Sequence, residues 1–151
     1  MIFIHPSGPS FFMHISAGWS LSGNGAFAYS GAMVRHESEK KPYPVYGEGD
    51  KQVLKQILVG PKDGFEGYLR EFTVQPGANT PYHQHDWYHV VYILEGSGFV
   101  KIDGTEHPVL AGSAVHAPEG VSHGFFNTGE GQMRFLCLVP KKGDAYGDAD
   151  G

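Results

Sequence analysis

Hydrophobic and polar residues alternate along the central and C-terminal chain in short runs that are typical of β-strands. Runs rich in Val, Ile, Leu, Tyr and Phe are separated by clusters of Gly, Pro, Asp and Asn, with no helical periodicity between them. The strands predicted in this way span residues 53–59, 68–74, 90–94, 99–102, 113–116, 122–126 and 133–139. Short strands at this spacing predict an antiparallel sandwich or barrel. Asp103-Gly104 adds a strong hairpin signal after residue 102.

The last predicted strand has two faces, because side chains alternate along a strand with a period of two. Odd-numbered residues from 133 to 139 lie on one face, and even-numbered residues lie on the other. Either face could point inward. If the odd face does, Phe135 and Cys137 approach an internal cavity, although Cys137 could equally be a small buried hydrophobic residue.

The first 34 residues contain no Lys, Arg, Asp or Glu, and a charged surface composition begins only at Arg35. No basic start precedes a compact apolar stretch, so this segment does not read as a secretory signal. Residues 1–34 are expected to be either edge strands that cover a partner subunit or a segment upstream of the true start, with Met33 as the initiator. Residues 35–151 are predicted to form one barrel domain, with its core at about residues 50–140.

Size and charge narrow the class of protein. A chain of 151 residues and 16.5 kDa suits one domain that buries its core without disulfides. The net charge of −5 and the lack of a basic stripe argue against binding to nucleic acid or to an acidic membrane. No apolar run of about 18 residues is present to span a membrane. The single cysteine, Cys137, cannot form an internal disulfide, which fits the cytoplasm.

Four histidines lie in two glycine-punctuated motifs. These motifs read Gly77-x5-His83-x-His85-x3-His89-x6-Gly96 and Gly112-x5-Pro118-x-Gly120-x2-His123-x3-Asn127. On a strand, His83 and His85 point to the same face, and His89 keeps that parity. Three nitrogen donors then converge from one hairpin region, and His123 supplies a fourth from a second. We therefore predict that one metal ion binds through these four side chains, while the motif glycines serve backbone positions with positive φ or close approach.

The two motifs resemble those of the cupin superfamily over roughly residues 50 to 140. That family normally has Glu where this chain has His89, and the second motif is matched at every defined position. The chain looks most like the small single-domain four-histidine cupins, which share His-x-His-x3-His and segments similar to residues 69–74 and 134–141. The resemblance implies an all-β double-stranded β-helix, or jelly-roll barrel, with the metal inside its mouth. It also implies manganese as the favoured ion and dioxygenase-like activity.

The ligand set bears on the chemistry. Four neutral imidazoles leave a divalent ion with its full +2 charge, whereas three His and one Glu reduce it to +1. An octahedral ion with four protein ligands keeps two positions for water, a chelating substrate, or dioxygen plus substrate. Imidazole also suits Fe, Ni, Cu and Zn, so the sequence does not name the metal. We expect a Mn/Fe-type dioxygenase, or a related oxidoreductase or lyase, on a small chelating substrate. The alternative is a non-catalytic metal- or small-ligand-binding cupin.

Arg70, Trp87, Phe135 and Cys137 are the candidate substrate-pocket residues. Arg70 could anchor an anionic substrate, but arginines on strands are more often solvated or paired at a rim. Trp87 has the parity to face the histidines or to cover the mouth, and aromatic rims occur both in ligand pockets and in plain cores. Jelly-roll cupins commonly pair through sheet edges, so we also expect a homodimer.

Overall fold

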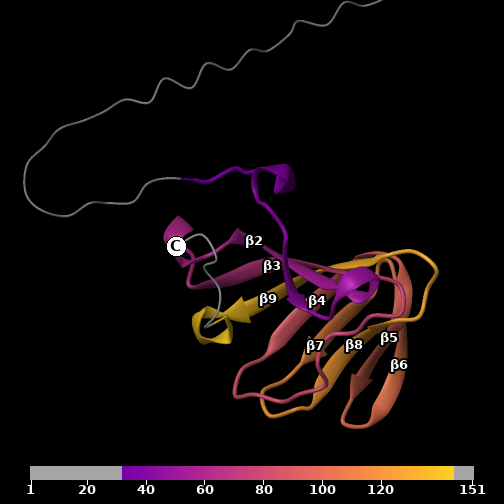
Figure 1. Ribbon diagram of the computed structural model, residues 1–151. Coiled ribbons are helices and arrows are strands. Elements are labelled where there is room, and N and C mark those ends of the chain that lie inside the picture. Colours follow the sequence, from indigo (N-terminus) through magenta and orange to yellow (C-terminus); the bar gives the residue numbers. More distant parts are fainter. Residues whose placement is uncertain (1–31, 145–151) are drawn as a thin grey trace, which may run out of the picture. The chain divides into compact units, whose positions relative to one another are not determined.

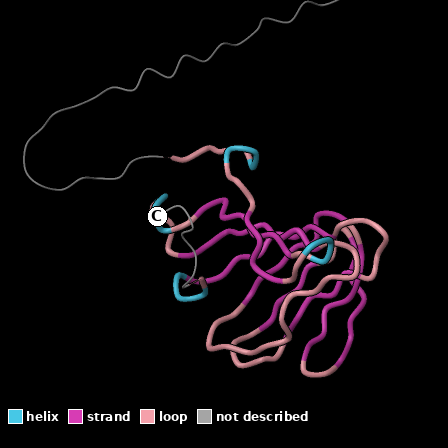
Figure 2. Tube along the Cα trace, in the orientation of Figure 1, coloured by secondary structure: helices cyan, strands magenta, loops and turns pink. Residues whose placement is uncertain are grey.

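The computed structural model describes residues 32–144, which form nine β-strands and four 3-10 helices of one turn each. The strands are β1 (Tyr43–Tyr46), β2 (Val53–Val59), β3 (Gly67–Val74), β4 (His89–Glu95), β5 (Ser97–Ile102), β6 (Thr105–Leu110), β7 (Ala114–Ala117), β8 (His123–Asn127) and β9 (Met133–Pro140). The helices are η1 (Glu37–Glu39), η2 (Gly49–Lys51), η3 (Pro61–Asp63) and η4 (Lys141–Gly143), and Figure 2 shows them as isolated turns among strands and loops. The predictions for residues 1–31 lie outside the described residues. No helix within residues 32–144 has the length and apolar character needed to cross a membrane.

The strands are arranged in two antiparallel sheets (Figure 1). The larger sheet has the order β1-β2-β3-β9-β4-β7, and the smaller has the order β6-β5-β8. β9 therefore inserts between β3 and β4, and it pairs with β3 along its whole length and with β4 over residues 134–138. This order is that of a jelly-roll barrel, and it confirms the predicted all-β fold.

The core lies between the two sheets and is built around β9. Its odd-numbered residues are buried and its even-numbered residues are half-buried, so the odd face points inward. The ring of Phe135 stacks on Phe72 of the same sheet, with centroids 5.3 Å apart, and on Phe125 of the smaller sheet at 4.7 Å. These stacked rings join the sheets face to face.

Most strands lie within two residues of their predicted bounds, and β2 has the predicted bounds at both ends. β1 and β6 are exceptions, because neither was given a range from the sequence. Each is an edge strand of its sheet, and each contains a proline, Pro44 or Pro108. Proline cannot donate to a ladder, so it is tolerated at an edge while it weakens the sequence signal for a strand.

The four motif glycines all have positive φ, as predicted: Gly77, Gly96, Gly112 and Gly120. Gly96 shows the constraint most clearly. Its φ is 80°, and a Cβ atom there would lie 2.4 Å from the carbonyl oxygen of Gln132. Only glycine fits this tight connection between β4 and β5.

Candidate metal centre

The four motif histidines come from three parts of the chain. His83 and His85 lie in the loop of residues 75–88, His89 begins β4, and His123 begins β8. Neither His83 nor His85 lies on a regular strand, so the expectation from the sequence is wrong in detail: the loop meets β8 through two isolated bridges, Asn79 with Phe126 and His83 with His123. The His83 N–H donates to the His123 carbonyl at 3.1 Å, and the His123 N–H donates to the His83 carbonyl at 2.8 Å. This reciprocal pair of backbone hydrogen bonds holds the first motif beside the second.

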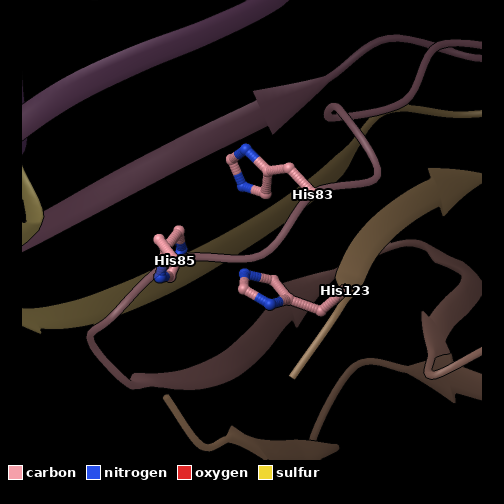
Figure 3. A group of neighbouring side chains, drawn as sticks. All are labelled: His83, His85 and His123. Carbon is pink, nitrogen blue, oxygen red and sulfur yellow. The ribbon is translucent and has the colours of Figure 1, made fainter. Parts of the chain in front are cut away.

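The side-chain nitrogens of these histidines gather in one place. His83, His85 and His123 each offer a ring nitrogen, and these three atoms lie within 4.8 Å of one another. Figure 3 shows their rings pointing toward a shared space from the loop and from β8. His89 Nε2 lies 2.9 Å from His85 Nε2, which adds a fourth ring to the cluster. Three histidines are therefore positioned to bind a metal ion, with His89 beside them.

Hydrogen bonds fix the tautomers of two rings. His85 Nδ1 lies 2.8 Å from the Trp87 carbonyl, and His123 Nδ1 lies 2.9 Å from the Val121 carbonyl. A carbonyl only accepts, so each Nδ1 carries the proton and each Nε2 presents a lone pair. The Nε2 atom of His123 is buried and has no hydrogen-bond partner among the described residues. A buried acceptor without a donor, aimed into a cluster of acceptors, fits a bound cation.

Burial keeps these rings neutral. It lowers the pKa of His89 to about 2, assisted by the positive charge of Arg70, and it lowers the pKa of His85 to about 4. Desolvation also lowers the pKa of His83. Neutral imidazole is the form that binds metal, so at neutral pH protons do not compete for these three side chains.

A cavity of about 310 Å³ adjoins the histidine cluster. Its lining includes all four candidate pocket residues, Arg70, Trp87, Phe135 and Cys137. Trp87 lies flat against His85, with ring centroids 3.9 Å apart and planes 5° apart. Phe72 and Phe125 extend the wall that Phe135 begins. The result is an apolar chamber with nitrogen donors at one side.

The same cavity has a buried charged side, of which the sequence predicted only Arg70. Arg70 is 5% exposed, and its Nη1 donates to Asp144 Oδ2 at 3.1 Å. Lys55 Nζ donates to both oxygens of Asp144, at 2.9 and 3.0 Å. Lys55 shares the inward parity of Val53 on β2, which was an available signal, whereas Asp144 lies beyond the last strand and carried none.

Cys137 connects this charged side to the histidines. Arg70 Nη2 donates to Cys137 Sγ at 3.1 Å, and His89 Nδ1 lies 3.2 Å from the same sulfur. Burial raises the pKa of the Cys137 thiol. The residue is therefore more than a small core hydrophobe, since it contacts both a motif histidine and a buried cation.

Fold and site together define a jelly-roll barrel with a candidate metal centre in its interior. Comparison with known proteins supports this fold. The cupin domain family matches residues 70–139. The crystal structure of the polyketide cyclase RemF from Streptomyces resistomycificus is similar at 34% identity and a TM-score of 0.65, with 73% of this chain and 80% of that chain covered. The chain belongs to the cupin family.

Two further relatives illustrate the range of this similarity. The oxalate-binding protein of Thermotoga maritima is 28% identical over 112 residues, which cover 71% of this chain and 93% of that protein. Auxin-binding protein 1 of Arabidopsis thaliana is 31% identical over 98 residues, or 59% of this chain. The match spans only 48% of the plant protein's own length. These two relatives are named for the ligands they bind and RemF is named as a cyclase, so the family alone does not define a reaction.

Proposed function

We propose that this protein is a metal-dependent enzyme that acts on a small molecule chelating the metal through oxygen atoms. The observation that carries the proposal is the position of the histidine nitrogens, which converge at the side of a cavity of about 310 Å³ instead of being closed over by protein. A purely structural site has no need of adjoining space, whereas catalytic sites keep positions open.

In this proposal His83, His85, His89 and His123 hold one divalent ion. The ion would act as a Lewis acid that polarises a chelated carbonyl or hydroxyl oxygen. The chain supplies the remaining requirements. Trp87 and the carbonyl of Val121 orient two of the rings, and the aromatic wall excludes water from the body of the substrate.

Dioxygenase chemistry at manganese or iron is the first reaction class we propose, because four ligands leave room for both substrate and dioxygen. A redox-neutral lyase or cyclase reaction is the second, and the similarity to a protein named as a polyketide cyclase favours it. Substrates of both classes are small oxygen chelators such as catechols, flavonols and diketones. We propose that the protein works in the cytoplasm, as the single cysteine suggests.

The test combines metal analysis with turnover. Protein purified without chelators is analysed for Mn, Fe, Ni, Cu and Zn, then reconstituted with each and offered a panel of catechol, a flavonol and a 1,3-diketone. Oxygen consumption with loss of substrate supports a dioxygenase. Substrate loss without oxygen consumption supports the redox-neutral class. Stoichiometric metal with no turnover across the panel would instead support a non-catalytic binding protein, a role in keeping with the name of the Thermotoga relative.

We also propose that the protein is a homodimer. The outer face of β4 exposes an apolar stripe formed by Val90, Tyr92 and Leu94, with 44%, 49% and 38% of their surfaces accessible. Apolar residues on adjacent positions of one sheet face favour contact with another protein surface, and a second copy of the chain is the partner we propose.

A further inference from the structure

We propose that the charged side of the cavity, formed by Lys55 and Arg70, binds a carboxylate of the substrate, so that the enzyme acts on an aromatic or similarly apolar acid. The inference rests on the proposed function and narrows its substrate class. Three observations carry it: an excess of buried positive charge, N–H groups without acceptors, and the location of both within the cavity that adjoins the histidines.

The buried charges of the described residues at this side of the cavity do not balance. Among the described residues that line the cavity, Lys55 and Arg70 are the cations and Asp144 is the carboxylate. All three are at most 6% exposed. Two positive charges against one negative charge leave a net positive charge out of water, which costs free energy unless an anion joins it.

The donors exceed the acceptors as well. Arg70 has five N–H bonds, and the described chain gives it three acceptors: the Gly143 carbonyl at 3.3 Å, Asp144 and Cys137. Its Nε atom is buried and has no partner among residues 32–144. The indole Nε1 of Trp87 is also buried without a hydrogen-bond partner among these residues. Both side chains only donate, so the group that satisfies them must supply acceptor lone pairs, as the oxygens of a carboxylate do.

The charged side of the cavity lies close to the histidine cluster. Cys137 lies between Arg70 and His89, at 3.1 Å from the guanidinium and 3.2 Å from the imidazole. The guanidinium is therefore separated from a motif histidine by one sulfur atom. A substrate of modest size can place its chelating oxygens at the histidines and its carboxylate at Arg70. Its body would then lie against the aromatic wall of Phe72, Phe125 and Phe135.

The experiment compares 3,4-dihydroxybenzoate with catechol, since these probes share the chelating pair of hydroxyls and differ in the carboxylate. Affinities are measured by titration calorimetry for the native protein with and without manganese. We expect the acid to bind the loaded protein at least about tenfold more tightly than catechol, the effect of one or more charge-assisted hydrogen bonds. We expect Lys55→Gln to reduce this ratio at least threefold, because the variant removes one of the two buried positive charges that face the carboxylate.

Two outcomes would overturn the inference: equal affinities of the two probes in the loaded native protein, or the same ratio in the Lys55→Gln variant. The comparison in native protein decides the matter even if the variant does not fold. The proposed function fails separately, if loading with manganese does not increase the affinity for catechol. A preference for the acid in metal-free protein would then still support the carboxylate site.

Discussion

His89 on β4 and Cys137 on β9 face each other inside the barrel, with Nδ1 of the imidazole 3.2 Å from Sγ of the thiol. The other nitrogen of His89 is directed to the histidine cluster, 2.9 Å from His85 Nε2. The sulfur therefore occupies the position in which metal-binding histidines commonly have a partner for their second nitrogen, a partner that orients the ring.

We predict that Cys137→Ala weakens metal binding by about tenfold or more, the usual effect of removing a group that orients a ligand. When His89 Nε2 binds the metal, the ring carries its proton on Nδ1, and the alanine methyl group cannot accept a hydrogen bond from it, so the ring is free to turn. Cys137→Ser is the matched control, since its hydroxyl keeps an acceptor in place, and it should lose less. Competition titrations with a chromogenic chelator measure both. Native affinity in the alanine variant would show that the thiol does not orient His89.

Single replacement of His83, His85 or His123 by Ala should remove most of the bound metal and leave the barrel folded. The ligands come from one loop and one strand end, while the core is built from apolar residues of both sheets. His107→Ala and His116→Ala are controls, because both are exposed residues on other strands and should bind metal like the native protein. Elemental analysis with far-UV circular dichroism provides the readout. A His83→Ala/His85→Ala protein with one metal per chain would refute the site.

The sequence predicted the fold and the histidine cluster because both depend on local spacing. Runs of strand-forming residues between turn clusters predicted most strands, and two motifs of fixed spacing predicted the four histidines. His83 and His85 lie near each other although they belong to a loop, and the bridge from His83 to His123 on β8 gives that part of the loop a strand-like geometry. The two edge strands that contain a proline, β1 and β6, were not predicted, because proline weakens the sequence signal for a strand.

The charged side of the cavity depends on distance in the fold, which local spacing does not encode. Lys55 and Asp144 are 89 positions apart in the chain. Nothing in the sequence around Asp144 distinguishes it from a surface aspartate. The inward direction of Cys137 was similarly undecided, because alternation along β9 defines two faces without saying which one the barrel buries.

Asn127 is expected to stabilise the barrel without any part in chemistry. Its Nδ2 donates to the carbonyls of Val74 and Gly131, at 2.8 and 2.9 Å, and its Oδ1 accepts from the Gly129 N–H at 2.9 Å. Replacement by Ala removes the partner of the buried Val74 carbonyl and of two backbone groups in the more exposed turn after β8, so Asn127→Ala should cost about 1–3 kcal/mol of unfolding free energy. Asn79→Ala removes an exposed amide and should cost less than about 0.5 kcal/mol. Urea denaturation measures both, and equal midpoints would contradict this assignment.

The apolar stripe on β4 predicts how the proposed homodimer can be dissociated. Sedimentation of the native protein should give about twice the chain mass of 16.5 kDa. Charges at Val90→Lys and Tyr92→Lys would have to be desolvated in an interface, so the double variant should sediment as a monomer. Leu110→Lys is the control, because Leu110 is also exposed, at 62%, but lies on β6 of the other sheet. If the native protein sediments as a monomer at micromolar concentration, the proposal of a dimer is wrong.

The neutral histidines predict how the stability of the metal-free protein depends on pH. In the unfolded chain a histidine titrates near about pH 6.5, whereas the folded pKa is about 4 for His85 and about 2 for His89. Between pH 6.5 and 4 the unfolded state therefore binds protons that the folded state does not. The free energy of unfolding must then fall as the pH is lowered through this window, and it is insensitive to these groups above it. Chemical denaturation of metal-free protein at half-unit steps from pH 7.5 to 4.5 measures the slope. The His85→Gln/His89→Gln protein is the comparison, since all other titrating groups are shared. Its slope should be shallower below pH 6.5, and parallel curves would mean that these rings are protonated as readily in the folded protein as in the unfolded chain.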